Sequence, residues 1–287
     1  MKELIILSGK GGTGKTSIVG SLAVLAENKV MADCDVDAAD LHLLLSPQVR
    51  QKEEFWSGQT AFIDAKKCNH CGVCVDLCRF DAIHNFEVDP IACEGCGFCS
   101  HVCPTEAITM QDNMAGYLFV SDTKYGTLAH AKLGIAQENS GKLVARVRQE
   151  AKKIATATDA EYIICDGPPG MGCPVVSSLS GANMALLVVE PTLSGIHDMG
   201  RVLDVCRHFK VPALVCINKF DINEENTAKI ENYCNEQNVK IMGKIPFDNV
   251  VTEAMIQGVP VVEFSDNKVS QEIKNLWQNV LKSLNEN

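Results

Sequence analysis

The sequence of 287 residues predicts an α/β fold, with a mainly parallel sheet, helices on both faces and a small inserted α+β domain. Short apolar runs alternate with amphipathic stretches at 142–156, 194–208 and 224–236. Such alternation is typical of parallel strands joined by helices. A glycine-rich loop follows the first apolar run, and eight of the 14 cysteines lie between Cys68 and Cys103.

The composition restricts the class of protein. The hydrophobic share of 46% and the charged share of 22% are ordinary for a globular chain. A formal charge of −10 argues against direct binding to nucleic acid. The chain contains no long apolar run and no export signal, so we expect a cytoplasmic protein without a membrane span. In a reducing compartment, clustered cysteines usually indicate metal or redox chemistry.

The first motif lies between an apolar strand at residues 3–8 and a helix that starts near residue 17. Its pattern, G-x4-G-K-T between a strand and a helix, is that of a phosphate-binding loop. Glycines let backbone N–H groups face the phosphates, and the helix N-terminus adds positive potential. Lys15 is expected to contact the β- and γ-phosphates and Thr16 to bind Mg²⁺. The predicted nucleotide-binding residues of this loop are Gly9, Lys10, Gly11, Gly12, Thr13, Gly14, Lys15 and Thr16.

The loop sequence GKGGTGKT resembles the deviant Walker A motif of the MinD/ParA class of P-loop ATPases, to which the nitrogenase iron protein also belongs. In that class the early lysine, here Lys10, reaches into the nucleotide of the partner subunit. The resemblance therefore implies ATP as the nucleotide and a homodimer with ATP sandwiched at its interface. It also implies that Lys10 and Lys15 are catalytic. The chain alone leaves open that Lys10 is a solvated loop residue.

Acidic residues follow two further apolar strands. The strand at 29–33 ends in Asp33 and is followed by Asp35, and the run AEYIICDGPPG carries Asp166. Open α/β sheets bind ligands at this edge. By the resemblance, Asp35 orients the attacking water and is catalytic, Asp33 supports the Mg²⁺ shell, and Asp166 holds Mg²⁺ through water at the start of a mobile loop. Turn and cap chemistry is the alternative for the first two.

Two later strands, at 184–192 and 212–221, lead to the expected base-binding residues. By the resemblance, Asn218 reads adenine, and the loop around Pro246 packs against the base. The run Asn218-Lys219-Phe220-Asp221 also fits the N-K-x-D pattern with which many GTPases read guanine. The deviant lysine favours ATP over GTP.

The eight clustered cysteines form the spacing C-x2-C-x2-C-x3-C twice, 25 residues apart, which indicates an internal duplication. Three closely spaced thiolates can reach three irons of a 4Fe-4S cube, and in two-cluster proteins the fourth comes from the other half. We therefore predict two clusters with crossed ligands. The first set is Cys68, Cys71, Cys74 and Cys103, and the second is Cys93, Cys96, Cys99 and Cys78.

Residues 60–112 resemble a bacterial 2(4Fe-4S) ferredoxin, with one departure, because Arg79 and not proline follows Cys78. A pair of zinc sites is the alternative, but zinc has no use for eight thiolates in this crossed arrangement. The segment carries three basic and eight acidic residues, so a basic redox partner is expected.

The cysteine-rich segment is expected to interrupt the nucleotide-binding domain, leaving domains at 1–59 plus 113–287 and at 60–112. Residues 116–131 alternate in a way that predicts a hairpin returning to the sheet. The terminal stretch 269–284 has one apolar face. Its polar face is not strongly basic, so packing against the domain is favoured over membrane binding.

Together these motifs predict an ATP-hydrolysing iron–sulfur protein in which a dimer switch gates electron transfer to a redox or cofactor-assembly partner. A cluster scaffold or carrier, or a positioning ATPase with structural or sensing clusters, are the alternatives. Cys173 lies at the offset where the nitrogenase iron protein binds a bridging cluster, but the second ligand of that protein has no counterpart near residues 137–141. A structural or loosely redox-active thiol is favoured there.

Overall fold

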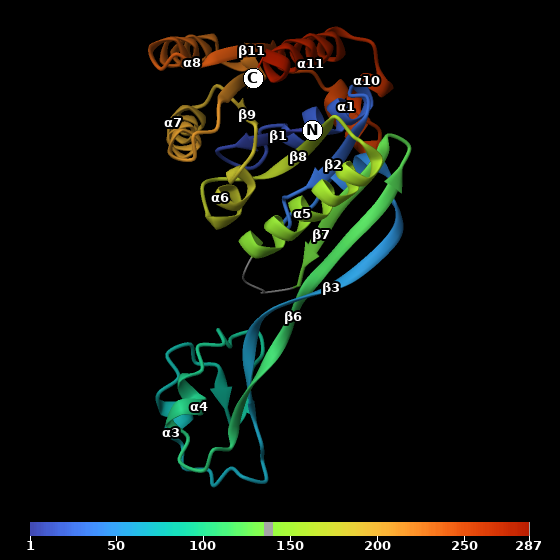
Figure 1. The fold of residues 1–287 in the computed structure, drawn as a ribbon. Helices are drawn as coiled ribbons and strands as arrows, with labels where there is room; N and C mark the ends of the chain where they lie inside the picture. The colour runs from blue at the N-terminus through green and yellow to red at the C-terminus, as the bar shows by residue number, and fades with distance from the viewer. Residues whose placement is uncertain (135–139, 287) are drawn as a thin grey trace. The chain divides into compact units, whose positions relative to one another are not determined.

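The computed structural model describes residues 1–134 and 140–286, which form two compact units (Figure 1). The large unit contains Met1–Lys52, Leu118–Lys132 and the described part of Ser140–Asn287. The small unit contains Glu53–Tyr117 together with Leu133 and Gly134.

A nine-stranded sheet has the order β11-β10-β9-β1-β8-β2-β7-β6-β3. The pairs from β11 to β7 are parallel. The two-residue turn Lys124-Tyr125 makes β6 and β7 an antiparallel hairpin, so the hairpin predicted at 116–131 is confirmed. The bounds are β1 Lys2–Ser8, β2 Lys29–Asp33, β3 Gln48–Ile63, β6 Ile108–Thr123, β7 Gly126–Leu133, β8 Tyr162–Pro169, β9 Met184–Val189, β10 Ala213–Asn218 and β11 Lys240–Ile245.

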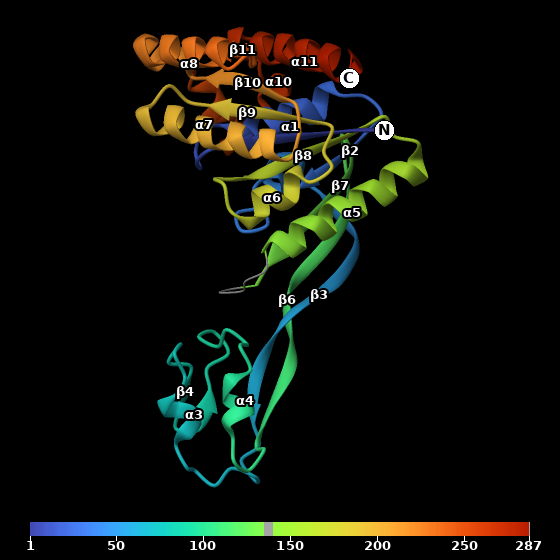
Figure 2. The same ribbon diagram turned by 60° about the vertical axis from the view of Figure 1, so that its left-hand side comes forward.

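Helices cover both faces of the sheet in the large unit, as the sequence predicted (Figure 2). Alternate residues of β1 face opposite sides, and Leu4 to Leu7 are all 0–1% exposed, which is the burial expected of a central parallel strand. One face carries α1 Lys15–Leu25, α2 Leu41–Leu45, α9 Val250–Ile256, α10 Val261–Phe264 and α11 Lys268–Glu286. The other carries α5 Ser140–Thr158, α6 Cys173–Leu179, α7 Leu193–His208 and α8 Glu224–Glu236.

The predicted terminal amphipathic stretch forms α11 and packs against the large unit, which confirms the favoured alternative. Its apolar side chains Ile273 and Leu276 are 2% and 0% exposed and belong to the core on the α1 face. Burying such a side chain stabilises a fold by about 1.5–3 kcal/mol. None of the helices in the described part of the chain is both long and apolar enough to cross a membrane.

The small unit contains the predicted insertion, residues 60–112. A minor core of Ala61, Cys74, Ile83 and Ile108 holds it together. The strand β3, which enters this unit, was not predicted, because its first seven residues are polar or exposed and show no apolar alternation. The remaining elements are α3 Val73–Asp76, the antiparallel pair β4 Ile83–His84 and β5 Glu87–Val88, and α4 Phe98–Val102.

Candidate functional site

The loop between β1 and α1 has the backbone that phosphate binding requires. Gly12 and Gly14 have φ of 79° and 84°, a region that other residues rarely adopt. A Cβ at Gly14 would lie 2.4 Å from Nδ2 of Asn218, so Asn218 packs directly on the loop. The Asn218 amide donates a hydrogen bond to the Thr13 carbonyl at 2.7 Å. These contacts fix the Asn218 side chain on the loop.

Lys15 joins the loop to the acidic strand ends. Its side chain is 6% exposed, and its ammonium donates to the Asp166 carboxylate and lies 3.7 Å from Oδ2 of Asp35. Burial alone would lower the pKa of Lys15, but the Asp166 carboxylate raises it above its usual value. Lys15 is therefore a cation held among carboxylates, at the position where an anionic ligand would compete for it.

The three predicted carboxylates meet at this site. Asp33 is fully buried and accepts hydrogen bonds from the N–H groups of Asp35 at 3.1 Å and Leu41 at 3.3 Å. Burial, and after it the Asp166 charge, raise the pKa of Asp33 well above its ordinary value. Burial raises the pKa of Asp35 to about 6, with Lys15 opposing the shift and Asp166 adding to it. Three carboxylates thus share one lysine, an excess of negative charge that suits a divalent cation.

No three acidic, histidine or cysteine side chains converge on one ion-sized position among residues 1–134 and 140–286.

A cavity of about 490 Å³ opens beside the loop, within the large unit. It is lined by the phosphate-binding loop, Asp35, Asn218, Pro246 and Phe247. Its wall contains a buried polar atom without a hydrogen-bond partner, the Thr13 hydroxyl oxygen. The Asp221 carboxylate, which would read guanine in an N-K-x-D site, accepts the Phe247 N–H at 2.7 Å. The volume and lining suit a nucleotide.

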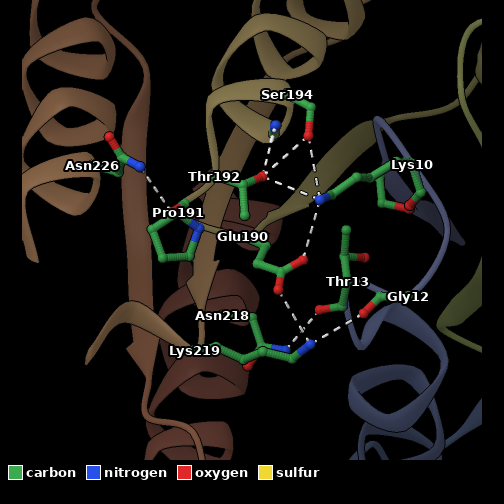
Figure 3. Close-up of polar contacts among 12 residues, drawn as sticks. Lys10, Gly12, Thr13, Glu190, Pro191, Thr192, Ser194, Asn218, Lys219 and Asn226 are labelled. Atoms are coloured by element: carbon green, nitrogen blue, oxygen red, sulfur yellow. Dashed lines mark hydrogen bonds and ion pairs between the residues drawn. The ribbon is translucent and has the colours of Figure 1, made fainter. Parts of the chain in front are cut away.

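The Lys10 side chain is 32% exposed, and its ammonium contacts residues of its own chain (Figure 3). Its ammonium lies 3.1 Å from the Thr192 hydroxyl, 3.4 Å from that of Ser194 and 3.5 Å from Oε2 of Glu190. The sequence did not identify Glu190, which comes directly after the apolar strand β9. The only local signal was a charged residue at the carboxyl end of a parallel strand, where ligands bind.

The eight clustered cysteines line two hollows in the small unit. The larger, about 280 Å³, is lined by Cys78, Cys93, Cys96 and Cys99, and also by Cys74, which lines both hollows. The smaller, about 10 Å³, is lined by Cys68, Cys71, Cys74 and Cys103. The thiols of each predicted crossed set thus share a hollow.

The internal duplication extends to individual hydrogen bonds. The Ala82 N–H donates to Sγ of Cys78 at 3.4 Å, and the Ala107 N–H donates to Sγ of Cys103 at 3.3 Å. These are the two crossing cysteines, each contacted by the residue four positions later. Burial opposes the shift, but hydrogen bonds from the backbone N–H groups lower the pKa of Cys103, which favours a thiolate ligand. Arg79, the departure from the ferredoxin pattern, leaves the matching bond at Cys78 intact.

The remaining cysteines differ in exposure. Cys34, Cys165, Cys206, Cys216 and Cys234 are buried. Burial raises the pKa of Cys206 and Cys216 to about 12, so both stay as inert thiols. Cys173 is exposed and begins α6.

The second ligand of a bridging cluster was sought near residues 137–141. Of these, residues 137–139 lie outside the described residues. Whether Cys173 binds a bridging cluster therefore stays a hypothesis.

A parallel sheet that gathers a glycine-rich loop and acidic strand ends around one nucleotide-sized cavity is the architecture of a P-loop nucleotide-binding protein. The chain matches the CobQ/CobB/MinD/ParA nucleotide binding domain over residues 4–261. It belongs to this family and is a P-loop ATPase of the MinD/ParA type.

Similar proteins carry several different names. An uncharacterized protein of Methanocaldococcus jannaschii is 35% identical over 279 residues, which cover 96% of this chain and 95% of that protein. An iron-sulfur cluster carrier protein of Pyrococcus horikoshii is 25% identical over 140 residues, or 44% of this chain and 47% of that protein. The septum site-determining protein MinD of Escherichia coli is 22% identical over 275 residues, or 90% and 83%.

Solved structures show the same fold. The cell division ATPase MinD of Pyrococcus furiosus matches with a TM-score of 0.62 and 19% identity, covering 98% of this chain and 99% of that one. The MinD of Pyrococcus horikoshii, complexed with Mg-ADP, has the same score and identity and covers 98% and 96%.

Proposed function

We propose that this chain is an ATP-hydrolysing iron–sulfur protein in which a nucleotide-dependent dimer switch gates electron transfer to a partner protein or to a metallocofactor under assembly. One observation carries the proposal. The chain has a complete P-loop site in its large unit and two complete cysteine sets, each around its own hollow, in its small unit.

The nucleotide half of the proposal rests on Lys15. A bound triphosphate offers this lysine more negative charge than Asp166 does, so Lys15 turns to the β- and γ-phosphates and frees the carboxylate. Asp166 then accepts hydrogen bonds from the water shell of Mg²⁺. Asp35, at the cavity wall, holds the attacking water in line.

ATP is favoured over GTP because Asp221 is engaged by the Phe247 N–H and holds the loop that begins at Pro246. Asn218, whose amide nitrogen donates to the Thr13 carbonyl, would recognise adenine through its side-chain oxygen. Lys10 would complete the site of the partner subunit in the dimer.

The redox half of the proposal assigns residues 60–112 as a 2(4Fe-4S) ferredoxin-type domain. The set Cys93, Cys96, Cys99 and Cys78 borders a hollow with room for a cuboidal cluster. In the smaller hollow the thiols must turn outward to admit one. Bound 4Fe-4S clusters supply one-electron transfer. The protein's part is to provide the thiolates, and backbone N–H groups to Cys78 and Cys103 tune them.

The test begins with anaerobic reconstitution and counts of iron and sulfide, with about eight of each expected per chain for two four-iron clusters. The potentials of the clusters are then measured with ADP and with a non-hydrolysable ATP analogue. A shift between the two states is expected in the wild type and none in Lys15→Ala. If the clusters are fully loaded but their potentials and the rates of electron delivery are identical in both nucleotide states, the proposed gating of electron transfer is refuted.

A cluster carrier is the second candidate, favoured by the similarity of 44% of the chain to iron-sulfur cluster carrier proteins of Pyrococcus horikoshii and Pyrococcus abyssi. Incubation of the reconstituted protein with an apo-ferredoxin separates the two functions. A carrier transfers iron and sulfide, in a way that depends on nucleotide. An electron-transfer protein keeps its four-thiolate clusters and exchanges electrons only. A positioning ATPase would show neither.

A further inference from the structure

Lys10, the lysine expected to reach the nucleotide of the partner subunit, contacts residues of its own chain. The Lys10 ammonium is bound by two hydroxyls of the segment that leads from β9 into α7, and by the Glu190 carboxylate at 3.5 Å (Figure 3). The side chains of Lys10 and Glu190 are 32% and 17% exposed, so the pair is only partly in water. The contact is therefore strong enough to bias where Lys10 points.

The segment that binds Lys10 is rigid. The Thr192 N–H donates to the Glu190 carbonyl at 2.7 Å, and the Thr192 side chain accepts the Gly195 N–H at 3.0 Å as the N-cap of α7. Asn226 donates to the Pro191 carbonyl at 3.2 Å. A Cβ at Gly195 would lie 2.4 Å from the Glu190 carbonyl oxygen, so the turn is closely packed. The acceptors stay in place, and Lys10 is the part that moves.

Glu190 does not lose all of its partners when Lys10 leaves. Its other carboxylate oxygen lies 3.5 Å from the ammonium of Lys219, which also donates to the Gly12 carbonyl at 3.2 Å. Breaking a buried ion pair is expensive chiefly because one charge is left without a partner. Here Lys219 remains beside Glu190, so Lys10 can be released at low cost.

We propose that Glu190 is a positioning residue that holds Lys10 against its own subunit and sets how tightly the ATP dimer forms. The inference rests on the proposed dimer, in which Lys10 reaches the nucleotide of a second copy of this chain. That nucleotide must draw Lys10 away from Glu190, and it can shift the equilibrium only by its differential affinity for the released lysine. A triphosphate offers more negative charge than a diphosphate, so ATP opens the contact more effectively than ADP.

The size of the effect follows from the symmetry of the dimer. A partly exposed ion pair shifts an equilibrium by about two- to fivefold. Each dimer releases two Lys10 side chains, so the factor is squared. Without the Glu190 charge, the dissociation constant of the ATP dimer should fall by about four- to twenty-five-fold.

The experiment measures dimer dissociation constants by sedimentation equilibrium, with a non-hydrolysable ATP analogue and with ADP. Glu190→Gln should tighten the ATP dimer by the factor above. Glu236→Gln, the same change at an exposed position at the end of α8, should leave it unaltered. In a Lys10→Ala background, Glu190→Gln should have no effect. A merely structural role of Glu190 would weaken the dimer, whichever residue stands at position 10.

The outcomes separate this inference from the proposed function. If the wild type forms an ATP dimer that Glu190→Gln leaves unchanged or weakens, the role of Glu190 is refuted and the dimer stands. If the wild type forms no dimer with ATP, the proposed switch fails, and this inference with it. If Glu190→Gln folds poorly, Glu190→Asp serves as the second variant. Its shorter side chain keeps the negative charge but moves it away from Lys10 by the length of one methylene group. It should then tighten the dimer by a smaller factor, and an unchanged constant would refute the inference.

Discussion

Removal of the Asp35 charge should stabilise the nucleotide-free protein while it abolishes ATP hydrolysis. Burial and the neighbouring Asp166 raise the pKa of Asp35 to about 6, although Lys15 opposes the shift. The ionised carboxylate therefore destabilises the fold at neutral pH. Asn at this position keeps the shape without the charge.

The magnitude follows from the shift in pKa. A rise from 3.8 to about 6 corresponds to about 3 kcal/mol, at about 1.36 kcal/mol per unit. Because the folded-state pKa lies above the unfolded value, this penalty is complete above about pH 6 and is lost as the pH falls toward 4. The gain from Asp35→Asn should be about 1–3 kcal/mol at pH 7.5 and about half as large at pH 5.

The assay is urea unfolding of the EDTA-treated, nucleotide-free protein, followed by the fluorescence of Trp277. This residue is 6% exposed in the core of the large unit, and Trp56→Phe removes the other tryptophan of the chain. Asp204→Asn is the control, because its side chain is 70% exposed and its ion pair is on the surface. That control should change the free energy of unfolding by less than about 0.5 kcal/mol.

Two results would refute the reasoning. One is destabilisation by Asp35→Asn at pH 7.5, and the other is a gain that does not shrink between pH 7.5 and pH 5. Addition of Mg²⁺ and ADP should narrow or reverse the difference, because the wild-type carboxylate cluster then has a divalent cation to neutralise it.

Three further predictions concern positions outside the nucleotide cavity. A Cβ at Gly95 would lie 2.0 Å from a carbonyl oxygen of β3, so Gly95→Ala should lower iron incorporation several-fold. Gly97→Ala is the control, because a Cβ there meets only open space. Its effect should be smaller and should come only from the φ of 74° at that position. Cys78→Ser should lower the iron count from about eight to about four per chain, and Cys173→Ser should leave it unchanged; a loss of iron from the second variant would establish the bridging cluster. Arg148, 5% exposed, makes two hydrogen bonds to the buried carboxylate of Glu3, which also lies 2.9 Å from the Lys152 ammonium. Because Lys152 remains as a partner, Arg148→Met should destabilise the large unit by about 1–3 kcal/mol in urea unfolding.

The motifs with short spacing could be predicted from the sequence. The loop from Gly9 to Thr16 is contiguous, and its strand and helix flank it directly. The apolar strands of the parallel sheet were also predictable, because strands buried on both faces are apolar throughout. β3 was not predictable, since its exposed polar residues are ordered by pairing with β6 and not by burial. The ion pair between Arg50 and Asp122, at 3.1 Å, is one of the contacts that hold them together.

In the nucleotide site, too, the sequence predicted individual residues but not the contacts between them. The sequence identified Lys15, Asp166 and Asn218 as separate candidates by their motifs, yet 151 residues separate Lys15 from Asp166. Glu190 carried no motif at all, and only its distance to Lys10 gives it a role.

The sequence by itself determined the nucleotide loop, the order of strands and helices and the two cysteine repeats, because local spacing sets local backbone geometry. Only the tertiary structure decided which side chains meet. A parallel sheet brings the carboxyl ends of its strands to one edge, so loops far apart in the chain come within hydrogen-bonding distance there. The pairing of Lys15 with Asp166 and the contact of Lys10 with Glu190 arise in this way, from folding and not from spacing.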